Sequence, residues 1–380
     1  MPDPTMRREL PARLRAATPA GADVVAWAPG RANLIGEYTD FNDGFVLPVA
    51  LEACTWLLGR SGGDRLALHS LDEPGEAVVD LATGDGPSDG WAAYATGVVR
   101  ALRDTGLTPT GFEGVIASDV PRGAGLSSSA ALESGVALAM LPDPPGAATL
   151  ALICQRAENV YVGVRCGIMD QLSSAAGRAG DALLIDCRSL EMRTVAVPHG
   201  LTVMLIDSGV RRSLTDGRYN EIRADCEHAA QSLGVAALRD IDESGLEAAA
   251  GRLEPALLRR ARHVVSENRR TLEAADALQA GDLEALRALF AESHRSMARD
   301  LGISTPEMDL LVELAMATTG VVAARLTGGG FGGCTVNLVQ EGRVEQAAAT
   351  IVQAYSAATG RSGRWWSSTP GDGAGRGPAR

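Results

Sequence analysis

Apolar and polar positions along the chain follow two different rhythms, which predict a protein built from strands and helices together. Short apolar or alternating stretches are typical of strands, and these are residues 23–28, 55–58, 65–69, 182–186 and 202–207. Residues 91–104 and most of residues 221–301 instead have the spacing and composition of helices. Two further strands are predicted at residues 321–326 and 334–339, on either side of a run of glycines.

The stretch from residue 115 to residue 140, VIASDVPRGAGLSSSAALESGVALAM, combines a strand end, a glycine and serine loop, and a helix that starts near Ala130. Glycines lower the cost of a tight turn, and serines at a helix start leave backbone N–H groups pointing outward. This arrangement is an anion cradle at the positive end of a helix dipole, where phosphate is the commonest occupant. A serine-capped helix after a flexible loop is the simpler alternative.

The sequence contains no lysine, and this limits the nucleotide sites that it can build. The common P-loop requires Gly-Lys-Ser/Thr, and protein kinases require a strand lysine that contacts the phosphates. Both are excluded, together with Schiff-base chemistry on a lysine amine. Phosphate has to be held here by backbone dipoles, hydroxyl groups, arginine and a metal ion.

Length and charge set further limits. A chain of 380 residues is too long for one ordinary hydrophobic core, so two domains are expected. The net charge of −12 repels polyanions, which argues against nucleic-acid binding. No apolar run is long enough to span a membrane or to serve as a signal peptide. Six scattered cysteines without a C-x-x-C pair favour free thiols, and we expect a cytoplasmic location.

Residues 29–51, PGRANLIGEYTDFNDGFVLPVAL, alternate charged and apolar side chains tightly. Carboxylates accept hydrogen bonds from sugar hydroxyls, and an arginine can stabilise anionic charge, so this stretch suits a polyhydroxyl ligand. Asp170 stands in apolar company within CGIMDQLSSAAG, where an aspartate is costly unless it is paired or functional. A general base is one possible function. Glu158 also has apolar neighbours, although a lone helical glutamate usually lies on a solvated face.

Two weaker signals have structural interpretations. GGGFGG at residues 328–333 matches G-x-G-x-x-G, but a Rossmann fingerprint opens a helix and the segment that follows here is a strand. We expect a glycine turn through which the backbone approaches a ligand closely. His263 and Glu267 are one helical turn apart without a second histidine at zincin spacing, so we expect a structural pair.

Three separated motifs, GRANLIGEYTDFNDGFVLP, VPRGAGLSSSAALE and LTGGGFGGCTV, together resemble the signature motifs of the GHMP small-molecule kinases. The first has the form found in galactokinases, and CGIMDQ, RYNEIRADCE and RARHVVSENRR are similar to galactokinase segments. The resemblance implies an α+β, two-domain GHMP kinase fold. A ribosomal S5 domain 2-like N-terminal domain is expected at residues 7–188, a ferredoxin-like C-terminal domain at 189–367, and a disordered tail at 368–380.

The resemblance implies ATP-dependent phosphorylation of galactose at the anomeric 1-hydroxyl. Asp170 would be the catalytic base, and Arg31 would offset charge in the transition state. The implied sugar site consists of Glu37, Tyr38, Thr39, Asp40, Gly167, Asp170 and Tyr219. The implied ATP site consists of Gly123, Ala124, Gly125, Leu126, Ser127, Ser128, Ser129, Gly329 and Gly330. Mg²⁺ would be held by Ser129 and Glu158.

One departure from the family pattern bears on the sugar. Galactokinases usually have histidine where this chain has Tyr38, and that histidine contacts the end of the sugar near its 6-hydroxyl. We expect galactose to be accepted with altered tolerance at the 6-position. Phe41 and Ala32, in place of the usual tyrosine and valine, threaten no role.

Two alternatives to a galactokinase remain. One is a kinase for a 6-modified or N-acetylated hexose, and the other is a non-catalytic galactose and ATP sensor, against which the intact motifs argue. The expected partners are ATP and a small sugar, with no nucleic acid and no membrane. We expect the chain to be a monomer or a weak homodimer.

Overall fold

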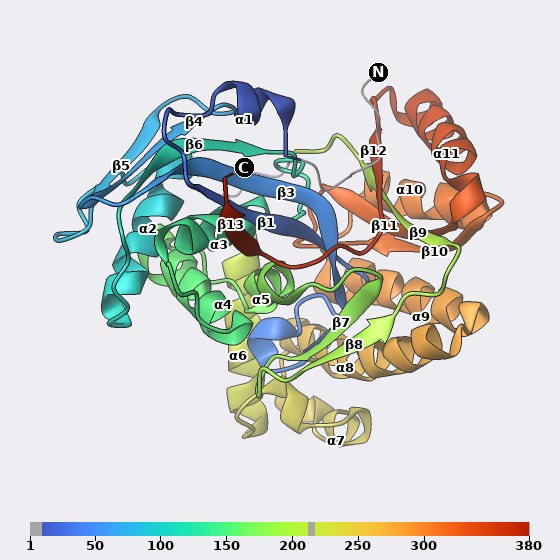
Figure 1. Cartoon of the computed structure of the whole chain (residues 1–380). Coiled ribbons are helices and arrows are strands. Elements are labelled where there is room, and N and C mark those ends of the chain that lie inside the picture. The colour runs from blue at the N-terminus through green and yellow to red at the C-terminus, as the bar shows by residue number, and fades with distance from the viewer. Residues whose placement is uncertain (1–9, 212–216, 380) are drawn as a thin grey trace.

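The computed structural model describes residues 10–211 and 217–379, which form three sheets with helices packed against them (Figure 1). The largest sheet has six strands in the order β13-β1-β3-β6-β4-β5. Its strands are β1 (Val24–Asn33), β3 (Pro48–Ser61), β4 (Arg65–Ser70), β5 (Glu76–Asp80), β6 (Phe112–Ser118) and β13 (Gly375–Pro378). All neighbours are antiparallel except β4 and β6, which run parallel.

Helices cover one face of this sheet and enclose the first core. They are α2 (Gly90–Asp104), α3 (Ser128–Met140), α4 (Ala147–Arg156) with its π-helical continuation η2 (Ala157–Val162), and α5 (Met169–Ala176). Every residue of α3 from Ala130 onward is buried, because the helix lies between the sheet and its neighbouring helices. Its N-terminal end therefore has a fixed position relative to β1, and the predicted phosphate loop leads into that end.

A small sheet leads from the first region to the second. It contains β2 (Phe45–Val46), β7 (Asp181–Asp186) and β8 (Met192–Ala196), and β2 follows the short helix η1 (Asp40–Asn42). β8 pairs with β7, whereas the next strand belongs to another sheet. The change of sheet thus falls between β8 and that strand, slightly beyond the predicted domain boundary.

The second region is built on a four-stranded antiparallel sheet in the order β10-β11-β9-β12. Its strands are β9 (Leu201–Asp207), β10 (Val321–Leu326), β11 (Cys334–Gln340) and β12 (Arg364–Ser368). Helices α10 (Pro306–Ala317) and α11 (Val344–Thr359) share an apolar core with it, formed by residues such as Ile206, Leu311 and Ile351. The short helix η6 (Glu341–Arg343) precedes α11.

A helical segment joins β9 to β10 and packs against the sugar motif, residues 29–51. It comprises α6 (Arg218–Leu233), η3 (Leu238–Asp240), α7 (Glu243–Ala248), η4 (Ala250–Arg252), α8 (Pro255–Ala280), α9 (Leu283–Ser296) and the π-helical η5 (Met297–Leu301). Its core includes Tyr38 of the sugar motif together with Cys226, Leu257 and Met308. The predicted helices at 91–104 and across 221–301 are confirmed, as are the predicted strands.

The C-terminal tail corrects one prediction. Residues 368–380 were expected to be disordered because they are rich in glycine and proline, but β13 pairs with β1 along Val24–Trp27 at the edge of the large sheet (Figure 1). A Cβ atom at Gly375 would lie 2.5 Å from the Trp27 ring, so glycine allows this close approach. Composition alone does not distinguish that use of glycine from flexibility.

The first helix and the thiols complete the description of the fold. A short N-terminal helix is present as α1 (Ala12–Ala16). All six cysteines are free, as predicted. Among the residues that the structure describes, no helix combines the length and the apolar character required to cross a membrane.

Candidate active site

Asp170 and Arg31 meet at the centre of the site, where the end of β1 approaches the first turn of α5. The Asp170 Oδ1 atom lies 2.8 Å from Arg31 Nε and 2.6 Å from Arg31 Nη2. Arg31 is buried and also donates from Nη1 to the Gly125 carbonyl at 2.7 Å. About a quarter of the Asp170 side chain is exposed, so its carboxylate is held firmly and remains accessible. The predicted catalytic pair is thus a real contact.

Ser127 supplies the second restraint on this carboxylate. Its hydroxyl donates to Asp170 Oδ2 at 2.5 Å, so it does not cap α3 with its side chain as the sequence suggested. The residue adopts a left-handed conformation with φ of 57°, which is uncommon for a residue with a side chain and marks a position fixed by its surroundings. The end of the phosphate loop is therefore tied directly to the predicted base.

The glycine loop at 328–333 lies against the phosphate loop. A Cβ atom at Gly328 would lie 2.9 Å from the Gly125 carbonyl oxygen, and one at Gly333 would lie 3.2 Å from that of Ala124. Both glycines have positive φ, so their lack of a side chain serves the turn and the close approach together. The glycine loop joins β10 to β11, as predicted. Two loops that are about 200 residues apart in the sequence thus lie directly against each other.

Three buried polar side chains lie beside Asp170. Gln171 Nε2 donates to Glu158 Oε2 at 2.9 Å and to Glu133 Oε2 at 3.3 Å. Burial, and then the charge of Asp170, raises the pKa of Glu158 to about 7. Burial and the nearby Glu158 raise the pKa of Glu133 well above its usual range. Among the residues that the structure describes, the Oε1 atom of Glu133 has no hydrogen-bond partner.

Glu158 is the first acidic residue of the π-helical turn η2, and Ser129 contributes a hydrogen bond to its carboxylate. π-Helical turns occur often at functional sites. The structure therefore brings together the two predicted metal ligands. Within the described residues, no group of three or more His, Cys, Asp or Glu side chains could hold a metal ion by itself.

Asp40 lies on the sugar-motif side of Asp170. Its carboxylate accepts hydrogen bonds from the backbone N–H of Phe41 and of Met169, and it packs on Gly167. A Cβ atom at Gly167 would lie 2.0 Å from Asp40 Oδ2, so only glycine fits beneath this carboxylate. Burial, and then the charge of Asp170, raises the pKa of Asp40 to about 6. Three of the predicted sugar-site residues are therefore neighbours.

An aromatic cluster made of Tyr38, Phe41 and Tyr219 adjoins Asp40. The ring centroids of Tyr38 and Tyr219 are 5.2 Å apart, and Phe41 lies within 6 Å of both. Burial, and then the charge of Asp40, raises the pKa of Tyr219 well above its usual range. The Tyr38 hydroxyl donates to the Gly329 carbonyl at 2.8 Å. Tyr38 thus connects the sugar motif to the glycine loop.

Glu37 and Thr39 point away from the open side of the site. Glu37 is 1% exposed, forms an ion pair with Arg325 of β10, and accepts a hydrogen bond from the Gly328 N–H at 3.1 Å. Burial raises its pKa, while Arg325 opposes that rise. The Thr39 hydroxyl lies 2.8 Å from the Gly36 carbonyl oxygen and 2.7 Å from that of Phe45. The sequence grouped both with the sugar ligands, but the structure places them behind the motif.

The ion pair of Glu37 continues into a buried network. Arg325 is fully buried, and its Nη2 lies 3.4 Å from Glu267 Oε1. Glu267 also receives hydrogen bonds from Arg270 Nε at 2.8 Å and from the Gly36 N–H at 3.1 Å. Burial would raise the pKa of Glu267, but Arg270 and its other cationic neighbours lower it to about 2. We call Glu37, Arg325, Glu267 and Arg270 the buried ion network.

His263 is also structural. Its Nε2 lies 3.0 Å from the Glu37 carbonyl oxygen, and its Nδ1 lies 3.0 Å from Ser296 Oγ. Burial lowers its pKa to about 4, so the imidazole is neutral near pH 7. His263 and Glu267 thus both stabilise the sugar motif from the interior. They do so through hydrogen bonds to other residues and not through a hydrogen bond to each other.

Two residues of this region were missed by the sequence reasoning. Arg325 lies within an apolar strand, VVAARL, and Glu133 lies within an apolar helix, ALESGVALAM. A charged residue in such surroundings is costly unless paired, and the same argument singled out Asp170. Applied evenly along the chain, that argument would have found both.

Comparisons with known proteins agree with this geometry. The galactokinase galactose-binding signature matches residues 16–61, the GHMP kinases N terminal domain matches residues 93–178, and the GHMP kinases C terminal family matches residues 274–357. A galactokinase from Roseiflexus sp. (strain RS-1) is 46% identical in an alignment of 367 positions that covers 93% of each chain. One from Chloroflexus aggregans (strain MD-66 / DSM 9485) is 45% identical and covers 89% of each chain.

Solved structures show the same relationship. The structure of Lactococcus lactis galactokinase complexed with galactose has a TM-score of 0.88 and 32% identity, covering 94% of this chain and 95% of that one. A mevalonate kinase from Methanococcus jannaschii, with 17% identity and a TM-score of 0.64, shares the fold alone.

The fold and the site define a GHMP kinase of two-domain α+β architecture. Within that class, the chain belongs to the galactokinase family, whose reaction is the ATP-dependent phosphorylation of galactose to galactose 1-phosphate. The predicted family, fold and enzyme activity are confirmed.

Proposed function

We propose that Asp170 accepts the proton of the anomeric 1-hydroxyl of galactose while that oxygen attacks the γ-phosphorus of ATP. The bond from this phosphorus to the β–γ bridging oxygen breaks, and ADP leaves. A free sugar hydroxyl is a poor nucleophile, and a positioned carboxylate that takes its proton is the chemistry that phosphoryl transfer requires. The observation that carries the proposal is the double restraint on Asp170. Arg31 binds one carboxylate oxygen and Ser127 binds the other, while a quarter of the side chain stays exposed.

Arg31 has a second role in this proposal. It contacts Asp170 and the Gly125 carbonyl of the phosphate loop at once, so its charge lies between the base and the nucleotide cradle. A fixed cation there stabilises negative charge that develops on the transferring phosphoryl group. The loop from Gly123 to Ser129 and the glycines Gly329 and Gly330 would bind the ATP phosphates through backbone N–H groups.

The residues present fit a Mg²⁺ ion. Glu133 and Glu158 are buried together, burial and their mutual repulsion raise the pKa of Glu133, and one Glu133 oxygen has no partner. A divalent cation bound through Ser129 and Glu158 would relieve this repulsion, and the ATP phosphates would complete its oxygen ligands. When bound, the ion neutralises charge on the phosphates.

The sugar would lie between Asp170, Asp40 and the aromatic cluster. Asp40 offers a partly buried carboxylate for sugar hydroxyls, Gly167 supports it from below, and Tyr219 provides an aromatic face. We propose that Glu37 and Thr39 act indirectly by fixing the motif that carries Tyr38 and Asp40. For the cellular setting, the six free thiols support the proposed cytoplasmic location.

The test is ATP consumption by the purified protein with Mg²⁺ across galactose, 6-deoxygalactose, N-acetylgalactosamine and glucose. We expect galactose to be the preferred substrate and phosphate to be found on its 1-oxygen. Preference for N-acetylgalactosamine would identify a kinase for a modified hexose instead. Tight galactose binding without turnover of any sugar would identify a sensor. Each result excludes the other two.

A further inference from the structure

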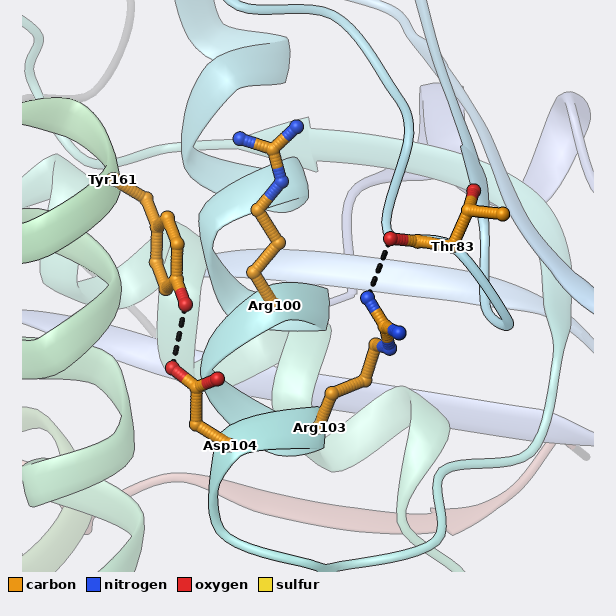
Figure 2. Close-up of a pocket in the computed structure, with 5 residues that line it drawn as sticks. All are labelled: Thr83, Arg100, Arg103, Asp104 and Tyr161. Atoms are coloured by element: carbon orange, nitrogen blue, oxygen red, sulfur yellow. Dashed lines mark hydrogen bonds between the residues drawn. The ribbon is translucent and has the colours of Figure 1, made fainter.

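Two polar hollows lie away from the active site, and they differ in how their side chains are satisfied. The first, of about 430 Å³, is lined by Thr83, Arg100, Arg103, Asp104 and Tyr161 beside α2. Figure 2 shows that its groups bond to one another: Arg103 donates to the Thr83 carbonyl at 2.5 Å, and the Tyr161 hydroxyl donates to Asp104 at 2.5 Å. This hollow needs no ligand.

The second hollow, of about 490 Å³, lies between α7, α8 and the end of α9 with η5. Figure 1 shows α7 at the outer edge of the molecule, beneath α8. Arg262, Ser266 and Arg269 follow one face of α8, four and three residues apart. Arg295 and Arg299 follow one face of α9 and η5 in the same way. The arginines of two helices therefore converge on one space, which we call the α7–α8–α9 hollow.

Arg270 forms the inner wall of this hollow, and its guanidinium is incompletely paired. The residue is 5% exposed, and its Nε donates to Glu267. Its buried Nη2 has no hydrogen-bond partner in the described part of the chain. A buried guanidinium nitrogen without an acceptor is costly, and Arg270 is one of the side chains that line the hollow. Because Glu267 already holds the Nε side, little conformational freedom would be lost when a ligand binds.

The rim of the hollow adds unpaired positive charge. Within residues 10–211 and 217–379, Arg262, Arg295 and Arg299 form no ion pair and no side-chain hydrogen bond, and all three are exposed. Carboxylates also line the hollow. Glu243 pairs with Arg269, and Asp300 accepts a hydrogen bond from Ser296.

Two further lining carboxylates, Glu247 and Glu292, form no ion pair and no side-chain hydrogen bond among the described residues. They would repel a bare anion, but they accept hydrogen bonds from the hydroxyl groups of a larger ligand. Five arginines face four carboxylates in all, so the hollow combines a site for an anion with acceptors for hydroxyl groups.

We propose that the α7–α8–α9 hollow binds the phosphate group of a small molecule, either free phosphate or a phosphorylated sugar. Guanidinium groups bind phosphate through paired, charge-assisted hydrogen bonds, and five arginines line this hollow. The volume suits a small ligand. The site is separate from the proposed ATP cradle, which is built from backbone N–H groups on other elements.

The test measures binding of inorganic phosphate and of glucose 6-phosphate by calorimetry at constant ionic strength. Saturating Mg-ADP and galactose are present, so that the catalytic site is occupied and no turnover occurs. The test variant is Arg295→Gln/Arg299→Gln. The matched control is Arg65→Gln/Arg259→Gln, which removes the same charge at two exposed, unpaired positions outside the hollow.

We expect one phosphate-dependent site in the unmodified protein and in the control, and binding about tenfold weaker in the hollow variant. Galactose turnover without added phosphate should be the same in all three proteins, which shows that they are folded. Tighter binding of glucose 6-phosphate would identify a phosphorylated sugar as the ligand class, and equal binding would identify free phosphate. Absence of binding beside Mg-ADP, or equal binding by the hollow variant, would overturn the proposal.

Discussion

The proposed catalytic centre and the buried ion network each contain an arginine–carboxylate pair with one partner in the sugar motif, residues 29–51. The surroundings of the two pairs differ. Arg31 and Asp170 meet where the carboxylate is about a quarter exposed. Arg325 and Glu37 meet where neither side chain has more than 1% exposure. Water and ligand can reach the first pair and cannot reach the second. The same kind of ion pair therefore takes part in the proposed reaction in one place and fixes the position of the backbone in the other.

This difference shows that a motif does not assign one role to all its residues. Within residues 29–51, Arg31 binds Asp170 and Asp40 lies beside Asp170, whereas Glu37 and Thr39 bond to structure behind the motif. Four predictions test this division, beginning with the change that should have the largest effect.

Replacement of Asp170 by asparagine should remove the base and leave the fold intact. We expect kcat for galactose to fall by as much as about 10⁴-fold, because an amide cannot accept the proton. The thermal unfolding midpoint should stay close to that of the unmodified protein, since the amide retains the shape and relieves the repulsion with Asp40. Steady-state kinetics and calorimetry on the same sample measure both quantities.

Asp181→Asn is a matched control for Asp170→Asn, because Asp181 lies on β7 away from the site. It should leave turnover unchanged. If Asp170→Asn retained more than a tenth of the activity, Asp170 would not be the base.

Replacement of Arg325 by methionine should instead lower the stability of the fold. It leaves Glu37 buried without a counter-ion, and breaking a buried pair in this way costs about 3–5 kcal/mol of the free energy of unfolding. Arg325→Met/Glu37→Gln should recover much of this loss, because the unpaired charge is removed as well. Urea unfolding measures the free energy of unfolding of the unmodified protein, the single variant and the double variant.

The matched control for the buried pair is Arg60→Met, which breaks an exposed pair with Glu113 on the large sheet. It should cost less than about 1 kcal/mol. A loss of stability for Arg325→Met no greater than that of Arg60→Met would show that the network is not structural.

Sequence reasoning predicted the residues that the structure brings together at the proposed catalytic centre, because their chemistry is local. The phosphate loop, Arg31 and Asp170 each lie in a motif with a recognisable purpose, and the structure brings them into contact. The strands and helices followed from periodicity for the same reason. The resemblance supplied the reaction, which periodicity could not.

What the sequence did not reveal depends on contacts between distant segments. Arg325 is 288 positions beyond Glu37 in the numbering (325 − 37), and only the folded chain shows that they pair. The close fit of Gly375 against Trp27 is likewise invisible in composition, so the last strand was taken for a disordered tail. Burial, the property that separates the two regions, is set by tertiary packing.

The third prediction concerns the pH dependence that Asp40 imposes. Its pKa is raised to about 6, so the carboxylate gains a proton as the pH falls through 6 and loses its capacity to accept a hydrogen bond from the sugar. We expect kcat/KM for galactose to fall about tenfold between pH 7 and pH 5. Because a raised pKa disfavours the charged form in the folded state, Asp40 should also reduce stability as the pH rises from about 4 to 6.

Asp40→Asn separates these effects. Its kcat/KM should be lower at pH 7 but should lose the decline near pH 6, and its stability relative to the unmodified protein should increase from pH 4 to pH 6. If the decline near pH 6 persisted in Asp40→Asn, another group would be responsible for it.

The last and smallest effect concerns Tyr38, which lies where the two regions meet. Its hydroxyl bonds to the Gly329 carbonyl, so we infer that it contributes to the wall of the site and offers little to the sugar 6-hydroxyl. Tyr38→Phe should therefore cost about 1 kcal/mol of stability and leave the ratio of kcat/KM for galactose to that for 6-deoxygalactose unchanged.

Tyr38→His restores the residue usual in the family and should raise that ratio about three- to tenfold, because an imidazole can bond to the 6-hydroxyl. An assay in which galactose and 6-deoxygalactose compete for the enzyme measures the ratio of their kcat/KM values directly. If Tyr38→Phe changed the ratio as much as Tyr38→His, the tyrosine hydroxyl would contact the sugar. Tyr38 would then belong with Asp170 and Asp40 among the residues that face the sugar, while its neighbours Glu37 and Thr39 bond to structure behind the motif.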